Sequence, residues 1–299
     1  MKSVLSVGKA RLEWGSRTYV MGILNITPDS FSGDGIIQEG SAGTWLEAAL
    51  EQARQFVAVG ADLLDVGGES TRPGAQTVGV AEELERVLPL IRRLAGEMDL
   101  PISIDTYKAE VAEQALQAGA CMVNDIWGFK VDPRLAEVAA RHKVPAILMH
   151  NRSSWANAQI QERLGGRYIG VPYDNLLEDI RRELMESVEI AQAAGIPDEH
   201  IILDPGIGFG KTVQQNLELL DRLDEIRSLG YPVLLGPSRK SFIGYTLDLP
   251  PDQRVEGTAA AVAIGIARGA DIVRVHDVAA MVRVVRMSDA IIRRKPSSG

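Results

Sequence analysis

Short apolar runs in this sequence each end in polar residues that could bind a ligand or take part in chemistry. In the first run, Ile23 and Leu24 precede Asn25, and Pro28 prevents the strand from continuing. We predict that Asn25 and its counterparts mark the catalytic end of the protein. The residues that close the eight runs are Asn25; Glu69, Ser70, Thr71 and Arg72; Asp105; Asn124 and Asp125; His150; Asp204; Ser238, Arg239 and Lys240; and Arg274 and His276.

The runs recur in a repeated pattern. The segments AVGADLLDVG (58–67), QAGACMVNDI (117–126) and ARGADIVRVH (267–276) each pass from a helix end through Gly-Ala into an apolar strand with a polar finish. Helical periodicity fills the gaps, and a supersecondary unit repeated around a barrel leaves such self-similarity. The other predicted strands are MGILN (21–25), PISIDT (101–106), PAILMH (145–150), HIILDPG (200–206) and YPVLLGPS (231–238).

Strands that alternate with helices indicate a parallel sheet covered by helices. For 299 residues we expect one α/β domain that forms a closed (β/α)8 TIM barrel, with a doubly wound open sheet as the alternative. The barrel should span about residues 20–294, and residues 1–19 should form a short hairpin that plugs its bottom. Active sites of such barrels lie at the C-terminal strand ends, where the polar residues collect.

Composition narrows the possible functions. A net charge of −8 and a pI near 5.2 argue against binding to nucleic acid or to an anionic membrane. The lone Cys121 excludes an internal disulfide and a thiolate metal cluster, which fits a reducing cytoplasm. Residues 1–20 lack the apolar core of a secretory signal, and no run reaches the roughly 20 apolar residues of a membrane span. We therefore expect a cytoplasmic protein that acts on small molecules.

Seven motifs follow one another along the chain: LNITPDSFS, DVGGESTRPGA, SIDT, VNDIWG, DPGIGFGKT, GPSRKSFIG and RVHDV. Together they resemble the dihydropteroate synthase family over about residues 20 to 280. The resemblance implies a TIM barrel that joins (7,8-dihydropterin-6-yl)methyl diphosphate to 4-aminobenzoate and releases diphosphate, with help from Mg2+, in folate biosynthesis. It also implies a homodimer formed through helices late in the chain.

The resemblance also implies a pterin pocket. A pterin presents N–H donors beside a carbonyl, so its pocket needs buried acceptors and at least one donor. Charge-assisted hydrogen bonds contribute roughly 1.5 to 3 kcal/mol each, so several of them can fix orientation and specificity. The residues at the matching positions are Asp105, Asn124, Met149, Asp204 and Lys240.

A diphosphate leaving group needs positive charge and hydrogen-bond donors. Arg274 and His276 lie two apart on the last strand, so their side chains should leave the same face. An Arg fork grips phosphate oxygens, and His donates a further bond. The resemblance adds Asn25 and Thr71 to this site and makes Asn25 an oxygen ligand of Mg2+. Closure of the barrel would place the strand of Asn25 beside that of Arg274.

The second substrate should lie over the loops at the barrel mouth. We expect the glycine-rich segment 32–43, with Asp34 as the best match to the family's loop acid, to be mobile and to exclude water on closing. The segment 151–173 departs from the family pattern, and we expect it to form a lid. The residues at family positions that contact 4-aminobenzoate are Phe31, Thr71, Arg72, Pro73, Phe209 and Ser241.

The predicted catalytic residues are Asp105, Lys240, Arg274 and His276. We expect the C–O bond to diphosphate to break first, while Mg2+, Arg274 and His276 stabilise the departing anion. Asp105 would stabilise the cation that develops on the pterin ring. The neutral amine of 4-aminobenzoate then needs no strong base, so no Ser-His-Asp arrangement is required.

Other interpretations remain open at this stage. A corrinoid-linked methyltransferase, an inactive pterin-binding paralogue and a nonenzymatic scaffold could share the barrel, and Lys240 could be a Schiff-base lysine. The segment GIGFGKT (206–212) is not a Walker A loop, because Pro205 stands where that motif needs Gly.

Some polar residues are interpreted as structural. Asp65 and Asp125 should bond backbone amides, and Thr106 should cap the helix that follows it. His150 is left open between a structural and a functional role.

Overall fold

The computed structural model describes residues 4–27, 44–70 and 77–293. Its main sheet is parallel, with the strand order β10-β7-β6-β5-β4-β3-β12-β11. A parallel bridge between Leu203 and Val233 joins the two outer strands, so the sheet closes. The predicted TIM barrel is therefore confirmed. Its strands are β3 (Tyr19–Asn25), β4 (Leu63–Gly67), β5 (Ile102–Asp105), β6 (Met122–Asp125), β7 (Ala146–Met149), β10 (Ile201–Asp204), β11 (Leu234–Leu235) and β12 (Ile272–Val275).

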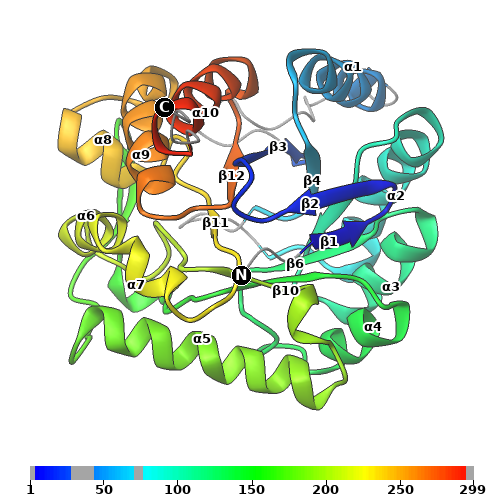
Figure 1. The fold of residues 1–299 in the computed structure, drawn as a ribbon, viewed down its shortest axis with the longest axis horizontal. Coiled ribbons are helices and arrows are strands. Elements are labelled where there is room, and N and C mark those ends of the chain that lie inside the picture. The colour runs from blue at the N-terminus through cyan, green and yellow to red at the C-terminus, as the bar shows by residue number, and fades with distance from the viewer. Residues whose placement is uncertain (1–3, 28–43, 71–76, 294–299) are drawn as a thin grey trace, which may run out of the picture.

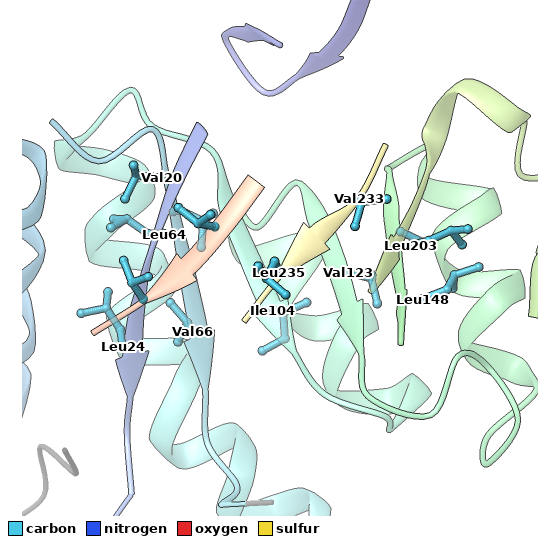
Figure 2. Close-up of a cluster of buried hydrophobic side chains, with 14 of the residues drawn as sticks. Val20, Leu24, Leu64, Val66, Ile104, Val123, Leu148, Leu203, Val233 and Leu235 are labelled. Atoms are coloured by element: carbon cyan, nitrogen blue, oxygen red, sulfur yellow. The ribbon is translucent and has the colours of Figure 1, made fainter. Parts of the chain in front are cut away.

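Helices surround this barrel (Figure 1). They pack against the outward-facing strand residues, including Val20, Leu64, Ile104 and Leu203, which Figure 2 shows on different strands of the barrel. The helices are α1 (Thr44–Val59), α2 (Val80–Glu97), α3 (Ala109–Ala118), α4 (Arg134–His142), α5 (Leu176–Ala193), α6 (Val213–Asp221), α7 (Leu223–Arg227), α8 (Ser241–Leu247), α9 (Val255–Ala267) and α10 (Val278–Ile292), with short 3-10 turns η1 (Trp155–Asn157), η2 (Asp198–His200) and η3 (Pro251–Gln253). None of the helices in the described part of the chain combines the length and apolarity that a bilayer crossing requires.

An antiparallel hairpin of β1 (Val4–Val7) and β2 (Ala10–Glu13) precedes the barrel. Figure 1 shows it near the centre of the ring of helices. Leu5, Leu12 and Trp14 are buried in the same cluster as residues near the N-terminal ends of the barrel strands, and each such burial stabilises by about 1.5 to 3 kcal/mol. The hairpin therefore plugs the bottom, as predicted. Its partners from the strands are Tyr19, Met21, Leu63, Met122, Ile147, Ile202, Leu234 and Ile272.

The segment 151–173 contains a second antiparallel hairpin, β8 (Ala158–Gln161) and β9 (Gly165–Tyr168), which the sequence patterns did not reveal. The first of these strands is largely exposed and the second begins with two glycines, so neither shows apolar alternation. The buried Arg254 donates to the carbonyl oxygens of Leu164, Leu249 and Arg239 at 2.9, 3.0 and 2.9 Å. These bonds tie the hairpin to the region around α8.

Thr106 is not the helix cap that we expected. Helix α3 begins at Ala109, and the backbone N–H of Ala109 donates to Asp132 Oδ2 at 3.0 Å. Thr106 Oγ1 instead accepts from the backbone N–H of Lys108 at 3.3 Å. The sequence pattern failed because the acceptor comes from a loop 23 residues further along the chain.

Candidate active site

Four adjoining strands bring the predicted pterin-binding side chains together at the mouth of the barrel. Asp105 ends β5 opposite Asn124 of β6, and Asp204 ends β10 opposite Met149 of β7. Asn124, Met149 and Asp204 are buried, while Asp105 is partly accessible. Parallel strands present their carboxyl ends at one edge, so the apolar runs bring hydrogen-bond acceptors and one thioether together at the mouth.

Arg274 connects two carboxylates across the interior of the barrel. Its Nε lies 2.5 Å from Asp65 Oδ2, and its Nη2 lies 2.7 Å from Asp105 Oδ2. Asn124 Nδ2 donates to the same Asp65 oxygen at 3.1 Å. Our interpretation of Asp65 as a carboxylate that bonds backbone amides was therefore wrong, because its partners are side chains of the site. The corresponding interpretation of Asp125 is correct, since it accepts from the backbone N–H groups of Trp127 and Phe129.

Burial sets the protonation behaviour of these groups. Desolvation raises the pKa of Asp105 to about 7, and the positive charge of Arg274 opposes that rise. Desolvation also raises the pKa of Asp204 to about 6, although the Gly206 backbone N–H donates to its carboxylate at 2.7 Å. Burial disfavours the charge on Arg274, but Asp65 and Asp105 together hold its pKa above the usual value. Both pocket carboxyl groups thus titrate close to neutral pH.

Asn25 and His276 meet across the junction of β3 and β12, as predicted from barrel closure. Asn25 Nδ2 lies 3.5 Å from His276 Nε2. Ser238 Oγ lies 3.0 Å from His276 Nδ1 and accepts from the His276 backbone N–H at 3.1 Å. With Nδ1 facing Ser238, the imidazole presents Nε2 toward the mouth. Ser238 therefore fixes the orientation of the ring, a role that its position after a strand did not predict.

The remaining predicted residues in the described part of the chain lie on two neighbouring loops. Lys240 Nζ lies 3.9 Å from the ring centroid of Phe209, so an ammonium faces an aromatic ring. A Cβ on Gly208 would approach Lys240 Cδ to 2.9 Å, so a side chain there would push Lys240 aside. Ser241 begins α8 directly after Lys240.

Phe31, Asp34, Thr71, Arg72 and Pro73, like the segment 32–43, lie outside the described residues. Just before residues 71–76, Glu69 is bonded by Lys108, by the Tyr107 hydroxyl at 3.3 Å and by the Val78 backbone N–H at 3.3 Å. Lys108 also pairs with the buried Glu83 at 2.5 Å. These bonds hold the residues on either side of 71–76.

Two functional candidates escaped the sequence analysis. Asp65 lies two residues before Gly67, and the period of two along a strand puts it on the inward face with Leu63. The rule based on the last polar residue of each strand does not include such an inward-facing side chain within a strand. The second candidate is Lys211, which is almost completely buried beside His150. Its place at the end of a rejected phosphate-loop motif gave no hint of this contact.

The residues present can accept a hard divalent cation only in a limited way. No group of three His, Cys, Asp or Glu side chains among the described residues is arranged to hold a metal ion. Asn25 turns its amide nitrogen toward His276, which leaves Oδ1 as a hard oxygen donor at the mouth. One protein oxygen suits Mg2+ when substrate oxygens and water complete its coordination.

Comparison with known proteins shows which family this chain resembles in sequence and structure. The pterin binding enzyme family model matches residues 21–276. Dihydropteroate synthases of Clostridium beijerinckii and Synechocystis are 50% and 52% identical, each over 97% of this chain and over 100% and 95% of their own lengths. The solved Xanthomonas albilineans dihydropteroate synthase with 4-aminobenzoic acid has a TM-score of 0.86 at 39% identity, covering 99% of this chain and 100% of that one.

A sulfonamide complex of the Yersinia pestis enzyme gives a TM-score of 0.87 at 40% identity, with 98% of this chain and 100% of that chain covered. The chain therefore belongs to the pterin binding enzyme family. Its matches along nearly the full length place it, within that family, among the dihydropteroate synthases, which are transferases.

Proposed function

We propose that this chain condenses (7,8-dihydropterin-6-yl)methyl diphosphate with 4-aminobenzoate to give 7,8-dihydropteroate and diphosphate, a step of folate biosynthesis. The observation that carries the proposal is the arrangement at one barrel mouth. Carboxylate and amide acceptors from β5, β6 and β10 lie beside the cationic end of β12. That combination suits one substrate with a donor-rich ring and an anionic leaving group.

The pterin ring would lie against Asp105, Asn124 and Asp204, with Met149 packing beside it. Ionised carboxylates accept the N–H groups of the ring, and Lys240 supplies a donor for its carbonyl. Because Asn124 donates its amide nitrogen to Asp65, its amide oxygen is oriented to accept. Asp65 would therefore act by setting the orientation of a ligand-binding side chain.

The diphosphate would lie at the Asn25 and His276 side of the mouth. Two nitrogens of Arg274 are held by Asp65 and Asp105, while its Nη1 makes no hydrogen bond to the described residues. The guanidinium can thus bridge the pocket carboxylates and a phosphate oxygen. Mg2+, bound through Asn25 Oδ1, would supply further neutralisation of the leaving group.

In the reaction the C–O bond to diphosphate breaks first and its electron pair leaves with the diphosphate. Asp105, next to the pterin, stabilises the positive charge that remains on the ring system. The amine nitrogen of 4-aminobenzoate then forms the new C–N bond and releases a proton to solvent. Lys240 and Phe209 lie where the second substrate would approach. A kinetic isotope effect typical of associative displacement would contradict this order.

We also propose a cytoplasmic homodimer formed through α9 and α10. Ile264 on α9 and Met287 and Ile291 on α10 are 47%, 63% and 57% exposed, although they are large apolar side chains. Exposed apolar residues on neighbouring helices are typical of subunit interfaces. Sedimentation of the wild type and of an Ile264→Lys and Met287→Lys double variant tests this, and a monomeric wild type at micromolar concentration would contradict it.

The decisive experiment measures diphosphate release from the pterin substrate in the presence and absence of 4-aminobenzoate. We expect release that requires 4-aminobenzoate and that declines when a chelator removes Mg2+. An inactive pterin-binding paralogue would bind the pterin without release. A methyltransferase would transfer a methyl group and ignore 4-aminobenzoate.

A further inference from the structure

A cluster of charged side chains lies behind the turn that carries Asp204 and Phe209. Lys211 and His150 are only 2% and 3% exposed. Glu183 of α5 and Arg152, which follows β7, complete the cluster. None of these four residues has a role in the proposed reaction, although burying a charge is costly unless the charge is paired and hydrogen-bonded.

Lys211 faces three hydrogen-bond acceptors. Its Nζ lies 3.0 Å from the carbonyl oxygen of Gly206, 3.0 Å from that of Phe209 and 2.9 Å from His150 Nδ1. An ammonium carries three N–H donors and no acceptor, so the charged form matches all three partners. Desolvation lowers the pKa of Lys211 to about 7, whereas the charges of Asp204 and Glu183 favour the ammonium. The number and type of the partners indicate that lysine is specifically required at this position.

His150 is suited to accept from this ammonium. Its Nε2 lies 3.0 Å from Glu183 Oε2, so a ring protonated at Nε2 donates to the carboxylate and offers Nδ1 to Lys211. Burial, and then the charge of Lys211, lower the pKa of His150 to about 3, which keeps the ring neutral. Arg152 Nε donates to Glu183 at 3.0 Å and balances that carboxylate.

The turn itself has little freedom to find another anchor. Gly206 has φ +72°, and a Cβ there would lie 1.9 Å from the His150 carbonyl oxygen. Gly208 donates to Asn216 Oδ1 at 2.7 Å, and the Gly210 carbonyl accepts from the Tyr173 hydroxyl at 2.9 Å. The Lys211 ammonium contacts two further carbonyl oxygens of the turn, that of Gly206, two residues after Asp204, and that of Phe209.

We propose that Lys211 is a positioning residue for the reaction. Its ammonium fixes the turn 205–210 so that Asp204 faces the pterin ring and the Phe209 ring faces Lys240, and His150 completes its coordination. The proposal rests on the proposed function for its kinetic consequence. It gives His150 an indirect role, which the sequence had left undecided.

The test replaces Lys211 with Met, which preserves length and removes all three donors. We expect KM for both substrates to rise about tenfold and kcat/KM to fall about 100-fold, because small displacements of binding groups have effects of that order. The control is Leu94→Ala, which empties part of the core on α2 and lowers Tm without touching the turn. If both variants have a lower Tm than the wild type but keep the wild-type KM values, Lys211 is only structural and the proposal is overturned.

A second variant covers the case in which Lys211→Met does not fold. His150→Phe removes one of the three acceptors, and we expect a smaller rise in KM, about threefold. Unchanged KM values in this variant would contradict the proposal. Amide hydrogen exchange of residues 206–210 should be faster in either variant than in the wild type and in Leu94→Ala. This readout needs no catalysis, so it tests Lys211 even if the wild type releases no diphosphate and the proposed function fails.

Discussion

The lower and upper halves of the barrel interior are built from opposite chemistry on the same strands. In β12, Ile272 belongs to the apolar cluster with the hairpin, while Arg274, two residues later on the same face, binds two carboxylates. In β4, Leu63 and Asp65 show the same change. The lower half stabilises the fold by removing apolar surface from water. The upper half keeps buried charges whose desolvation is offset only by mutual pairing. Stability and binding are thereby assigned to separate layers.

The largest effect should come from Arg274→Met, which breaks the upper layer. Asp65 and Asp105 would remain buried without their counter-charge, so we expect a loss of about 3 to 5 kcal/mol in the free energy of unfolding. The rate of diphosphate release should fall by about 10²- to 10³-fold. Urea unfolding and initial rates measure the two effects. Adding Asp65→Asn and Asp105→Asn should recover stability but not activity; recovery of both would show that the charges do not serve the reaction.

The matching change in the lower layer is Trp14→Ala. Trp14 is buried in the hairpin cluster and meets the Tyr19 ring edge-on at a centroid distance of 5.8 Å. Its removal should cost about 3 to 5 kcal/mol in the free energy of unfolding. The kcat of the folded fraction should stay within about twofold of the wild type. A large drop in kcat with normal folding would mean that the two layers are not independent.

The pH dependence of stability and of kcat/KM should arise from the carboxyl groups of the upper layer. Asp105 and Asp204 have pKa values raised to about 7 and about 6, so their contribution to stability is greatest below about pH 4 and declines as pH rises through these values. Binding of pterin N–H groups needs both ionised carboxylates, so kcat/KM should fall about tenfold per pH unit between about pH 7 and 6, and about 100-fold per pH unit below about pH 6. Asp204→Asn should weaken the dependence of Tm on pH. An unchanged dependence would exclude Asp204 as its source.

The smallest effect should come from Ser238→Ala, which leaves the charges in place. His276 would lose the acceptor of its backbone N–H and the partner of Nδ1. We expect transition-state stabilisation to weaken by about 1 kcal/mol, which corresponds to about a fivefold decrease in kcat/KM for the pterin diphosphate. The KM for 4-aminobenzoate should not change. Steady-state kinetics with each substrate varied in turn measures both values. A raised KM for 4-aminobenzoate would contradict the prediction.

The sequence predicted the barrel because each strand is short, apolar and closed by a polar residue at the same end. That rule placed Asn25, Asp105, Asp204 and His276 correctly at one mouth. It could not assign Asp65, whose partner Arg274 is 209 residues away and reaches it only once the barrel closes. Such pairings depend on side-chain direction inside the closed sheet.

Lys211 was missed for a related reason. Its three partners are two backbone carbonyls of a turn and a histidine 61 residues earlier, and no local pattern encodes them. Hairpin β8 and β9 lacked the apolar alternation by which strands are recognised, because β8 is largely exposed and β9 begins with two glycines.

The hairpin at the bottom of the barrel also limits the route by which reactants can reach the site. With Leu5, Leu12 and Trp14 packed across the N-terminal strand ends, the interior described by the structure opens toward the other end. Asp105 and Asp204 end their strands at that end, and Phe209 lies on the turn that follows β10, so both reactants of the proposed reaction would use the same mouth. The joined product would then leave by the same opening through which its two precursors entered. We expect the plug that stabilises the fold to make substrates and product compete for one entrance.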